Sequence, residues 1–394
     1  MGIKIDELVN SYIDDIIKIR RDIHNNPELG MNEVRTSEVV EKNLQGLGLD
    51  IKTGIGNTGV VAVLSGKNSG KTLLLRADMD ALPLNEVTDI PFKSRNAGIM
   101  HACGHDVHTA VLIGTAKVLS RLREHINGNI KFVFQPAEEC NPTGGATYMI
   151  KDGVLENPKV DAALALHVWD LPLGKIAIKP GVIMAQSDRI FIKIKGKSSH
   201  GSAPHQGADA IIAAAHVLTA LQTIVSRNIN PLDSAAISIG VINGGYRYNV
   251  IADEVNLEGT VRTFSNITAG KIPHKIKEIV NNVCLALGCI SEFKYVNGYP
   301  LTYNDEKLTY NVINSLEGFM GKNNVIIAEK PATAAEDFAF FNKHVPCAFM
   351  WLGCKSEINK NCCVIHNPNF ICDERSIAVG IRAMCHAALG YLNG

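Results

Sequence analysis

The sequence predicts an α/β protein in which a main domain, built on a mostly parallel sheet flanked by helices, is interrupted by an inserted α+β domain. Short apolar strands alternate with helices in the first part of the chain, and strands with one polar face follow residue 184. The chain has 394 residues, which is more than one ordinary hydrophobic core holds. We therefore expect residues 1–183 and 297–394 to form the main domain and residues 184–296 to form the insertion.

In the main domain, the period of the apolar residues distinguishes helices from strands. Between Ile5 and Ile23 they recur at helical spacing, and a second helix is expected at residues 109–122. Such helices alternate with short apolar runs, which are typical of strands buried on both faces and predict a sheet with helices on either side. These runs lie at residues 60–64, 72–76, 130–134 and 162–167.

In the insertion, the stretch RIFIKIK at residues 189–195 alternates apolar and polar side chains, as in a strand with one face in water. The βαββαβ order that follows from the rest of the insertion is that of a compact two-layer α+β unit. Helical and strand patterns alternate again from residue 304 onward. The further elements of the insertion are a helix at 208–227, strands at 235–242 and 255–264, a helix at 269–287 and a strand at 291–296.

The composition excludes several classes of partner. Lys and Arg together number 39, and so do Asp and Glu, which leaves no basic surplus for nucleic acid or a membrane surface. The charged N-terminus lacks the apolar core of a signal peptide, and we expect no membrane span, so we predict a cytoplasmic protein. In that reducing compartment most of the ten scattered cysteines should be free thiols, and the adjacent Cys362 and Cys363 match no zinc-ribbon spacing.

The stretch HACGHDVH at residues 101–108 is the strongest chemical signal in the sequence. It contains three histidines, a cysteine and an aspartate, which are side chains that bind borderline-soft divalent metals. Cys103 and His105 stand two residues apart, directly before an apolar helical run. A histidine-rich helix N-terminus without metal is the alternative.

Three further segments can complete a metal site. The strand at 130–134 leads into Gln-Pro-Ala-Glu-Glu, and neighbouring residues in extended chain point in opposite directions. One carboxylate of the pair Glu138 and Glu139 can therefore bind metal while its neighbour faces a metal-bound water molecule. An acidic turn in solvent is the alternative there. The next strand ends at His167, and His366 lies in a loop near the C-terminus; each is a weak signal by itself. In open α/β sheets, binding sites form outside the carboxyl ends of the strands.

Together these segments provide five candidate ligands. A catalytic zinc ion uses three protein ligands and a water molecule, so five ligands suit two ions that share one of them. A thiolate can bridge two ions, and the set contains one thiol. His101 and His108 are then not needed as ligands, and we expect them to support the ligands or to cap the helix. The five candidates are Cys103, His105, Glu139, His167 and His366, of which Cys103 is the candidate bridge.

The sequence resembles the M20 metallopeptidase family, and in particular its amidohydrolase branch of hippurate, indole-acetyl-amino-acid and N-acetyl-diaminopimelate hydrolases. A cysteine at position 103 is typical of this branch, because other branches use a carboxylate there. The matching motifs run in order along nearly the whole chain. They are RRDIHNNPELG (20–30), RADMDALPLNE (76–86), MHACGHDVHTA (100–110), QPAEE (135–139), LALHVWDLPLG (164–174), SSHGSAPHQGADAI (198–211), NVIADEV (249–255), GTVR (259–262), AAEDFAFF (334–341) and IHNPNF (365–370).

The resemblance implies a role for each candidate residue. The metal ligands would be the five residues named above, and Glu138 would be the general base that deprotonates a metal-activated water and passes the proton to the leaving amine. His200 matches a lid histidine that reaches the reacting carbonyl, in some relatives from the partner subunit. Asn249 and Arg262 match positions near the substrate carboxylate, and Asp80 matches a residue that orients a metal ligand. From the residues alone, His200 can equally be a surface loop residue, and Asn249 and Arg262 can be structural.

The implied activity is hydrolysis of the amide bond of N-acyl-L-amino acids, such as acetyl, benzoyl or indole-acetyl conjugates. The cofactors would be two divalent ions, for which zinc, manganese, nickel and cobalt all suit the mixed ligands. The insertion would be a lid and dimerisation domain on the catalytic main domain, which makes a homodimer the expected assembly. A dipeptidase or carboxypeptidase of the same fold is one alternative; a non-catalytic homologue is the other, and the presence of Glu138 argues against it.

Three stretches depart from the family pattern: Cys140–Gly145 after the glutamate pair, Ser198-Ser199 in the lid and Ala334-Ala335. None of them removes a ligand or the base. They bear on the shape of the substrate pocket, so the resemblance does not identify the preferred acyl group.

Overall fold

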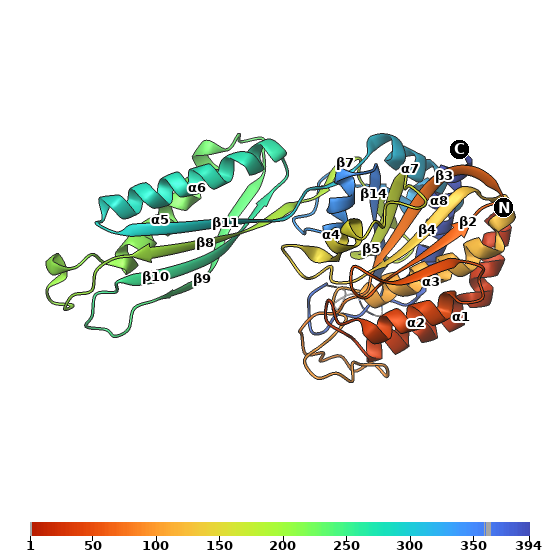
Figure 1. The fold of residues 1–394 in the computed structure, drawn as a ribbon, viewed down its shortest axis with the longest axis horizontal. Coiled ribbons are helices and arrows are strands. Elements are labelled where there is room, and N and C mark those ends of the chain that lie inside the picture. Colours follow the sequence, from red (N-terminus) through yellow and green to blue (C-terminus); the bar gives the residue numbers. More distant parts are fainter. Residues whose placement is uncertain (1, 358, 360–363) are drawn as a thin grey trace. The chain divides into compact units, whose positions relative to one another are not determined.

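The computed structural model describes residues 2–357, 359 and 364–394, so Cys362 and Cys363 lie outside the described residues. The chain divides into two compact units (Figure 1). The first unit comprises Met1–Ile183, Thr302–Lys330 and Asp337–Gly394, and the second comprises Met184–Leu301 and Pro331–Glu336.

Residues 297–301 and 331–336 group with the second unit, whereas we expected them in the main domain. Residues 297–301 group with the second unit because the last strand of that unit continues to Tyr299, which pairs with Ser187 on the neighbouring strand of the same sheet. Residues 331–336 group with the second unit because they hydrogen-bond to its first residues: the amide of Ala185 donates to the carbonyls of Ala332 and Ala334. The start of the second unit at residue 184 coincides with the expected start of the insertion.

The first unit is built around an eight-stranded mixed sheet with the order β1-β2-β4-β3-β5-β14-β6-β13. Its centre is parallel from β4 to β14, and antiparallel strands join at both sides, so the predicted α/β class is confirmed. A small separate sheet pairs β7 with β12. The strands are β1 (Asp50–Ile55), β2 (Gly59–Ser65), β3 (Asn68–Asp78), β4 (Asn127–Gln135), β5 (Ala162–Pro172), β6 (Ile176–Ile178), β7 (Gly181–Met184), β12 (Thr302–Asn304), β13 (Val325–Ile327) and β14 (Cys347–Lys355).

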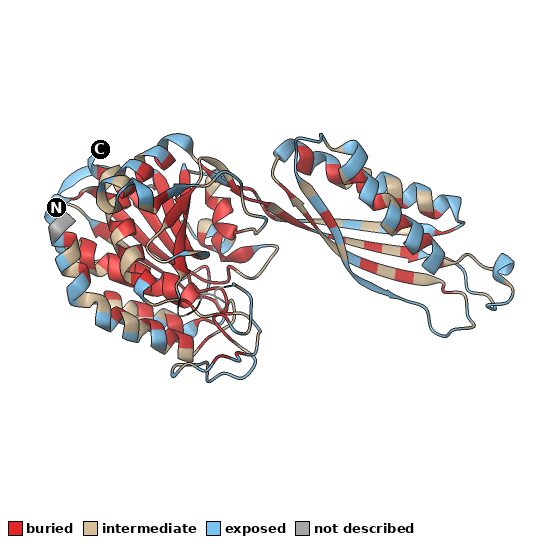
Figure 2. Cartoon of the chain, turned by 180° about the vertical axis from the view of Figure 1, so that it is seen from behind, coloured by how far each residue is buried: buried red, intermediate tan, exposed pale blue. Residues whose placement is uncertain are grey.

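Two helices of the first unit, α3 and α8, pack on the sheet, and α1 packs against both of them. Almost every side chain of α3 is buried, as expected for a helix that is apolar on most of its surface (Figure 2). The strands at the centre of the sheet are buried as well, which accounts for their uninterrupted apolar runs. The helices are α1 (Gly2–Asn25), α2 (Val34–Leu44), α3 (His105–Arg121), α4 (Gly144–Lys151), α7 (Glu306–Met320) and α8 (Arg375–Asn393).

The parallel centre brings the carboxyl ends of several strands to one edge of the sheet. Asp78 ends β3 opposite Gln135 at the end of β4, and His167 on β5 lies opposite Trp351 on β14. The loops that follow these strands therefore start from neighbouring positions. This is the edge at which sites form in open α/β sheets.

The second unit has the βαββαβ order that the sequence predicts, which confirms the inserted α+β class. Its sheet has the order β11-β8-β10-β9 and is antiparallel throughout. Alternate residues of β8, such as Ile190, Ile192 and Ile194, pack with both helices in one apolar core. The elements are β8 (Gln186–Lys195), α5 (Ala210–Thr223), β9 (Ala235–Gly244), β10 (Glu254–Thr263), α6 (Asn266–Ala286) and β11 (Ile290–Tyr299).

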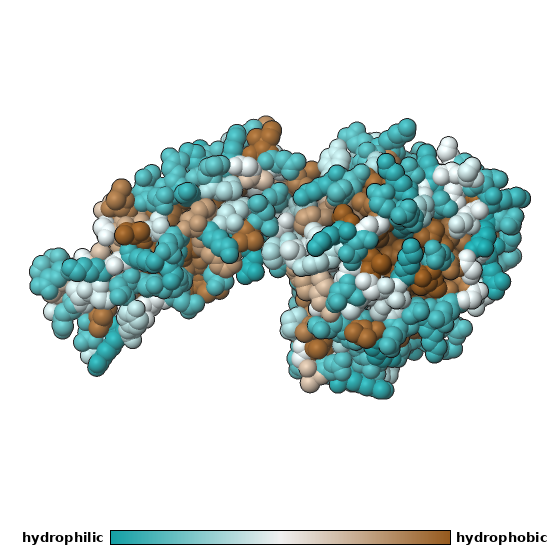
Figure 3. All heavy atoms as spheres, viewed as in Figure 1, coloured by the Kyte–Doolittle hydropathy of each residue, from teal (hydrophilic) through white to brown (hydrophobic). Residues whose placement is uncertain are grey.

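We expected no membrane span, and α5 is the element whose length and composition come near to one. With its extension, it forms the helical stretch Ala210–Asn228, which by length and composition is apolar enough to cross a membrane. The cause is its alanine-rich, two-sided apolar surface. One side packs on the sheet of its own unit, and the other leaves Ile211 and Ile212 about half exposed. Figure 3 shows apolar groups scattered over the surface of this unit among hydrophilic ones. The side chains that pack on the sheet include Ala210, Ala213, Ala214, Val217 and Leu221.

Candidate metal centre

Cys103 and His105 lie at the N-terminal end of α3, in the first unit. His105 is the first residue of the helix, and Gly104 between them has a φ of 87°. A side chain on Gly104 would be strained at that φ, and its Cβ would lie 2.4 Å from a methyl carbon of Val168. The glycine therefore lets the chain turn sharply into the helix while it packs against β5.

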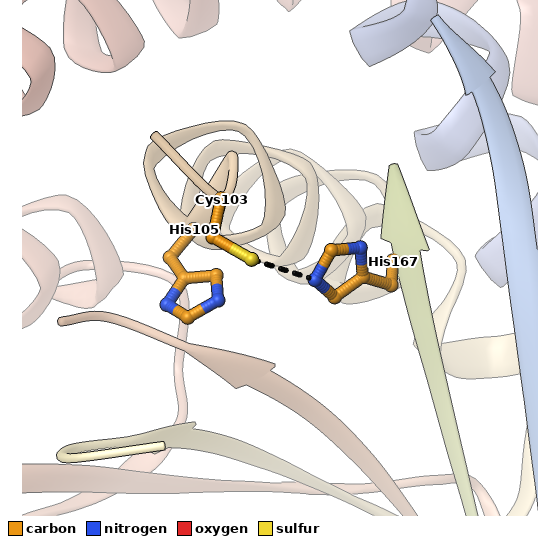
Figure 4. A group of neighbouring side chains, drawn as sticks. All are labelled: Cys103, His105 and His167. Carbon is orange, nitrogen blue, oxygen red and sulfur yellow. Dashed lines mark hydrogen bonds between the residues drawn. The ribbon is translucent and has the colours of Figure 1, made fainter. Parts of the chain in front are cut away.

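All five predicted ligands come together around the thiol of Cys103. Its Sγ atom lies 3.3 Å from Nε2 of His167 and 3.2 Å from Nε2 of His366 (Figure 4 shows the first of these contacts). Nε2 of His366 lies 3.0 Å from a carboxylate oxygen of Glu139. The amide of His366 also donates to the carbonyl of Ala102, which ties the C-terminal loop to the loop that carries Cys103.

The donor atoms form two groups that have the cysteine in common. Cys103, His105 and His167 offer three donor atoms within 4.8 Å of one another, and Cys103, Glu139 and His366 offer a second set within the same limit. Two ions that share one ligand would be held in such an arrangement, with the thiolate as the shared atom. The donor set therefore fits two divalent cations.

Asp80 orients two of these residues. Nδ1 of His105 donates to the Asp80 backbone carbonyl at 2.9 Å and lies 3.1 Å from its carboxylate. The other carboxylate oxygen of Asp80 accepts from the backbone amide of Glu139 at 2.9 Å. Nε2 of His105 is buried and has no hydrogen-bond partner within the part of the chain that the structure describes. An unpartnered buried nitrogen that faces other donors is what a metal ligand presents.

His108 supports the site without offering it a ligand. Its Nδ1 donates to Asp78 at 2.6 Å, and its Nε2 accepts from the amide of Val168 at 2.8 Å, so both ring nitrogens are used. The carbonyl of Val168 accepts from Nδ1 of His167 at 2.6 Å, which leaves Nε2 of His167 directed at Cys103. His101 is also buried, and neither of its ring nitrogens has a hydrogen-bond partner among the described residues.

Acidic side chains shift the pKa values of two candidate ligands. Burial and the neighbouring carboxylates of Glu139 and Glu138 raise the pKa of the Cys103 thiol well above its usual value. Burial by itself would lower the pKa of His105, but Asp78 and Asp80 raise it to about 10. A thiolate in these surroundings needs an adjacent cation, which is a second reason why the residues fit a metal centre.

Glu138 lies beside the candidate ligands. It is 6% exposed, and one of its carboxylate oxygens is 4.0 Å from Nε2 of His105. The other oxygen accepts from the amide of Asp337 at 3.4 Å. Glu138 and Glu139 thus reach the same space from adjacent positions, but they follow a residue with a positive φ, Ala137, rather than a plain extended strand.

The predicted lid residues lie in the second unit, at two separate places. His200 and Asn249 are neighbours, because the amide of Gly201 donates to the carbonyl of Asn249 at 2.8 Å. Both lie beyond the end of the sheet at which Glu254 of β10 pairs with β8. Arg262 lies near the other end of β10, eight residues further on, which corresponds to roughly 25 Å of strand. The structure therefore brings His200 and Asn249 together and keeps Arg262 apart from them.

Sequence reasoning missed two buried carboxylates near the site. Asp78 accepts from Arg76 at 2.6 Å as well as from His108, and its pKa is held low because these groups and His105 outweigh its burial. Glu33 is fully buried and accepts from the amide of Ala137. Asp78 stands in the quoted motif RADMDALPLNE and could have been selected there, whereas no motif marks Glu33.

Comparison with known proteins gives one family. Residues 74–390 match the family described as peptidase family M20/M25/M40. The chain is 40% identical to the N-acetyl-L-cysteine deacetylase of Bacillus subtilis, and the match covers 92% of this chain and 84% of the relative. It is 38% identical to thermostable carboxypeptidase 2 of Saccharolobus solfataricus, and that match covers 98% of this chain and 97% of the relative. Its fold is similar to that of a crystal structure from Bacillus subtilis described as a dinuclear metal binding peptidase of the M20 family, with a TM-score of 0.84, 32% identity, and 98% and 99% of the two chains covered.

Replacing the thiol tests the two donor groups. The change Cys103→Ala removes the one donor that both groups contain, so the purified protein should bind less than one equivalent of metal where the wild type binds two. Inductively coupled plasma mass spectrometry after dialysis against metal measures the stoichiometry. Cys385→Ala, which removes another fully buried thiol on α8, is the matched control and should keep both ions. Equal metal content in Cys103→Ala and wild type would show that the sulfur is not a ligand.

Proposed function

The chain belongs to peptidase family M20/M25/M40, and we propose that it hydrolyses the amide bond of N-acyl-L-amino acids with two divalent metal ions and Glu138 as general base. The observation that carries the proposal is the pair of donor groups that share Cys103, with the carboxylate of Glu138 next to them. Zinc, manganese, nickel and cobalt all suit thiolate, imidazole and carboxylate donors together. The relatives that match the chain are hydrolases, which supports an enzyme rather than a non-catalytic homologue.

The ligands of the two ions are proposed to be the five residues around Cys103. When bound, such ions would lower the pKa of a water molecule and polarise the carbonyl of the substrate. Glu138 takes a proton from the attacking water, which adds to the carbonyl carbon. The carbon–nitrogen bond then breaks, and Glu138 gives the proton to the departing amine, so that a carboxylic acid and a free amino acid result. The buried position of Glu138 keeps bulk water from competing for this proton.

The amine half of the substrate is proposed to be an amino acid with a free carboxylate. Deacetylation of an N-acetylated amino acid and removal of a C-terminal residue from a peptide both break an amide bond to such a leaving group. The deacetylase relative supports a small acyl group such as acetyl, and benzoyl and indole-acetyl groups remain the other proposed acyl groups. The carboxypeptidase relative supports a peptide as the acyl part, which is the second candidate function. Arg262 suits the carboxylate, because a guanidinium can bind it with two hydrogen bonds.

We further propose that His200 and Arg262 act on one substrate from two subunits. A conjugate of one amino acid and one acyl group is much shorter than the roughly 25 Å of strand between the two positions in one unit. His200 would donate to the reacting carbonyl, with Asn249 beside it, and would come from the partner in a homodimer. In that case, a single subunit lacks a complete site.

One edge of the second unit has the properties of a dimer interface. β9 is an edge strand of ten residues, none of them charged, and natural proteins usually protect such edges with charges or cover them. Between β9 and α5 lies an apolar hollow of about 290 Å³, lined among others by Ile211, Leu218 and Ile242. We propose that a second copy of the chain covers this edge, by adding its own β9 about a two-fold axis.

The cytoplasm is the proposed location. All eight cysteines among the described residues are free, which suits a reducing compartment.

A substrate panel tests the proposed function. Acetyl, benzoyl and indole-acetyl conjugates of one amino acid should be hydrolysed in the presence of zinc, manganese, nickel or cobalt, and the amide of the same conjugate, which lacks the free carboxylate, should react at least tenfold more slowly. Release of the free amino acid measures the rate. Faster cleavage of a dipeptide or tripeptide than of any acyl conjugate would favour the carboxypeptidase, and no cleavage of either class would refute the proposal.

Removal of the general base should separate catalysis from metal binding. Glu138→Gln keeps the size of the side chain but cannot accept a proton, so kcat should fall by about 10²–10⁴-fold while two metal ions remain bound. Steady-state kinetics and metal analysis of the same preparation measure both. Glu124→Gln, on the surface of the first unit, is the control and should behave as wild type. A Glu138→Gln enzyme with wild-type kcat would rule out Glu138 as the base.

Hybrid dimers test the sharing of the site. His200→Ala and Glu138→Ala homodimers should each be nearly inactive, but a hybrid of the two has one centre with an intact Glu138 and an intact partner His200. Each hybrid should therefore recover about half of the wild-type activity per dimer, as follows from two-fold symmetry. Sedimentation of differently tagged subunits verifies that hybrids form. Hybrids that form but stay inactive would show that His200 acts within its own subunit.

A further inference from the structure

The segment Glu28–Glu33 contacts both loops that carry the acidic residues of the metal centre. The backbone carbonyl of Glu28 accepts from the amide of Ala81, next to Asp80, at 2.8 Å. Five residues later, the side chain of Glu33 reaches the loop that carries Glu138 and Glu139. The ligands and the base assigned above include no residue of this segment, although it is close to both loops.

Glu33 is fully buried, and both oxygens of its carboxylate accept hydrogen bonds. One accepts from the backbone amide of Ala137 at 2.7 Å, and the other accepts from the hydroxyl of Thr58 at 2.6 Å. Burial raises the pKa of Glu33 to about 7, so the position does not depend on a permanent negative charge. The side chain of Glu33 provides a hydrogen-bond acceptor at a fixed place, directed at the backbone amide of Ala137.

That amide belongs to the residue whose backbone turns the loop toward the site. Ala137 has a φ of 55°, a conformation that is unfavourable for any residue with a side chain and persists only where the surroundings hold it. Its carbonyl accepts from the amides of Cys140 and Gly145, at 3.3 and 3.0 Å. The glycine is required there, because a Cβ on Gly145 would lie 1.7 Å from the carbonyl oxygen of Pro136.

The conformation of Ala137 sets the direction of the two glutamates that follow it. Glu139 has a further anchor, since its amide donates to the carboxylate of Asp80. Glu138 comes directly after Ala137 and before that anchor, and its carboxylate accepts only a long hydrogen bond from the amide of Asp337, at 3.4 Å, among the contacts described above. A loss of the hydrogen bond to Glu33 should therefore displace Glu138 more than Glu139.

We propose that Glu33 is a positioning residue for Glu138: by accepting the amide of Ala137, it keeps the loop in its left-handed turn and the base in reach of the metal centre. The inference rests on the proposed function, in which Glu138 is the general base. Glu33 itself touches neither the ligands nor the reacting atoms. Since a displacement of about 1 Å at a catalytic group can cost about 10²-fold in rate, its loss should be visible in kcat.

Three variants of Glu33 separate shape from charge. Glu33→Ala removes the acceptor, and Glu33→Asp keeps the charge but withdraws it by one methylene; both should lower kcat, Glu33→Ala by about 10²-fold, with KM changed less than threefold. Glu33→Gln keeps an oxygen in place and should remain within about fivefold of wild type. All three should still bind two metal ions. If Glu33→Ala does not fold, the other two variants still test the proposal, because Glu33→Gln should have a higher kcat than Glu33→Asp.

Glu28→Ala is the matched control. Glu28 belongs to the same segment, and its carboxylate also accepts backbone amides, those of Arg35 and Thr36, but these lie at the start of α2 and not in the loop of Glu138. This variant should be less stable but keep its kcat. A similar loss of kcat in Glu28→Ala and Glu33→Ala, a Glu33→Gln enzyme as slow as Glu33→Asp, or loss of a metal ion with unchanged kcat per loaded site would each overturn the proposal.

The amide proton of Ala137 gives a readout that does not depend on activity. In protein labelled with ¹⁵N-alanine, the signal that disappears in Ala137→Gly identifies this amide. Its exchange with deuterium should be slow in wild type and Glu33→Gln and at least tenfold faster in Glu33→Ala. Equal protection in all of them would overturn the proposal. If instead Glu138→Gln proves fully active, the base assignment fails while the exchange result still shows whether Glu33 holds the loop.

Discussion

The first unit has to accommodate several acidic groups in one small, buried space. Asp78, Asp80 and Glu138 are at most 6% exposed, and Cys103 and Glu139 lie beside them. Removing a charge from water costs several kcal/mol, so buried charges are tolerated only where partners compensate them. Arg76 supplies one fixed cation to Asp78. The donor atoms around the thiol of Cys103 suit divalent metal ions, which would compensate further negative charge there.

The fold takes two of the candidate ligands from regular elements and holds each of them with a second residue, whereas the other three lie in loops. His105 starts α3 and is fixed by Asp80. His167 lies in the middle of β5, which continues past the expected strand end, and is fixed by the carbonyl of Val168. These contacts use one nitrogen of each imidazole and leave the other free for the centre. These two histidines thus have a defined orientation before any ion binds, and partners of this kind tune the position and basicity of a metal ligand.

Much of this was predictable because local sequence carries the signal. The strands at the centre of the first unit are continuous apolar runs, and the five donors are residue types that rarely gather for another reason. Elements with weaker patterns were not predicted: β1 is largely exposed and has no apolar run, and α4 begins with Gly144 and Gly145. Glu33 was missed because its partner is a backbone amide 104 residues away, which leaves no trace in residue types. The separation of His200 from Arg262 depends on the pairing of β10, and motifs in sequence order cannot reveal it.

We propose that two metal ions share the thiolate of Cys103, and a cobalt titration of the metal-free protein tests this arrangement. Sulfur bound to Co²⁺ gives an intense near-ultraviolet charge-transfer band, and the visible bands of cobalt count the ions that enter the site. Our account predicts that two equivalents bind and that the sulfur band changes with the first and again with the second. A sulfur band that is complete after one equivalent, or a protein that binds a single ion, would contradict it.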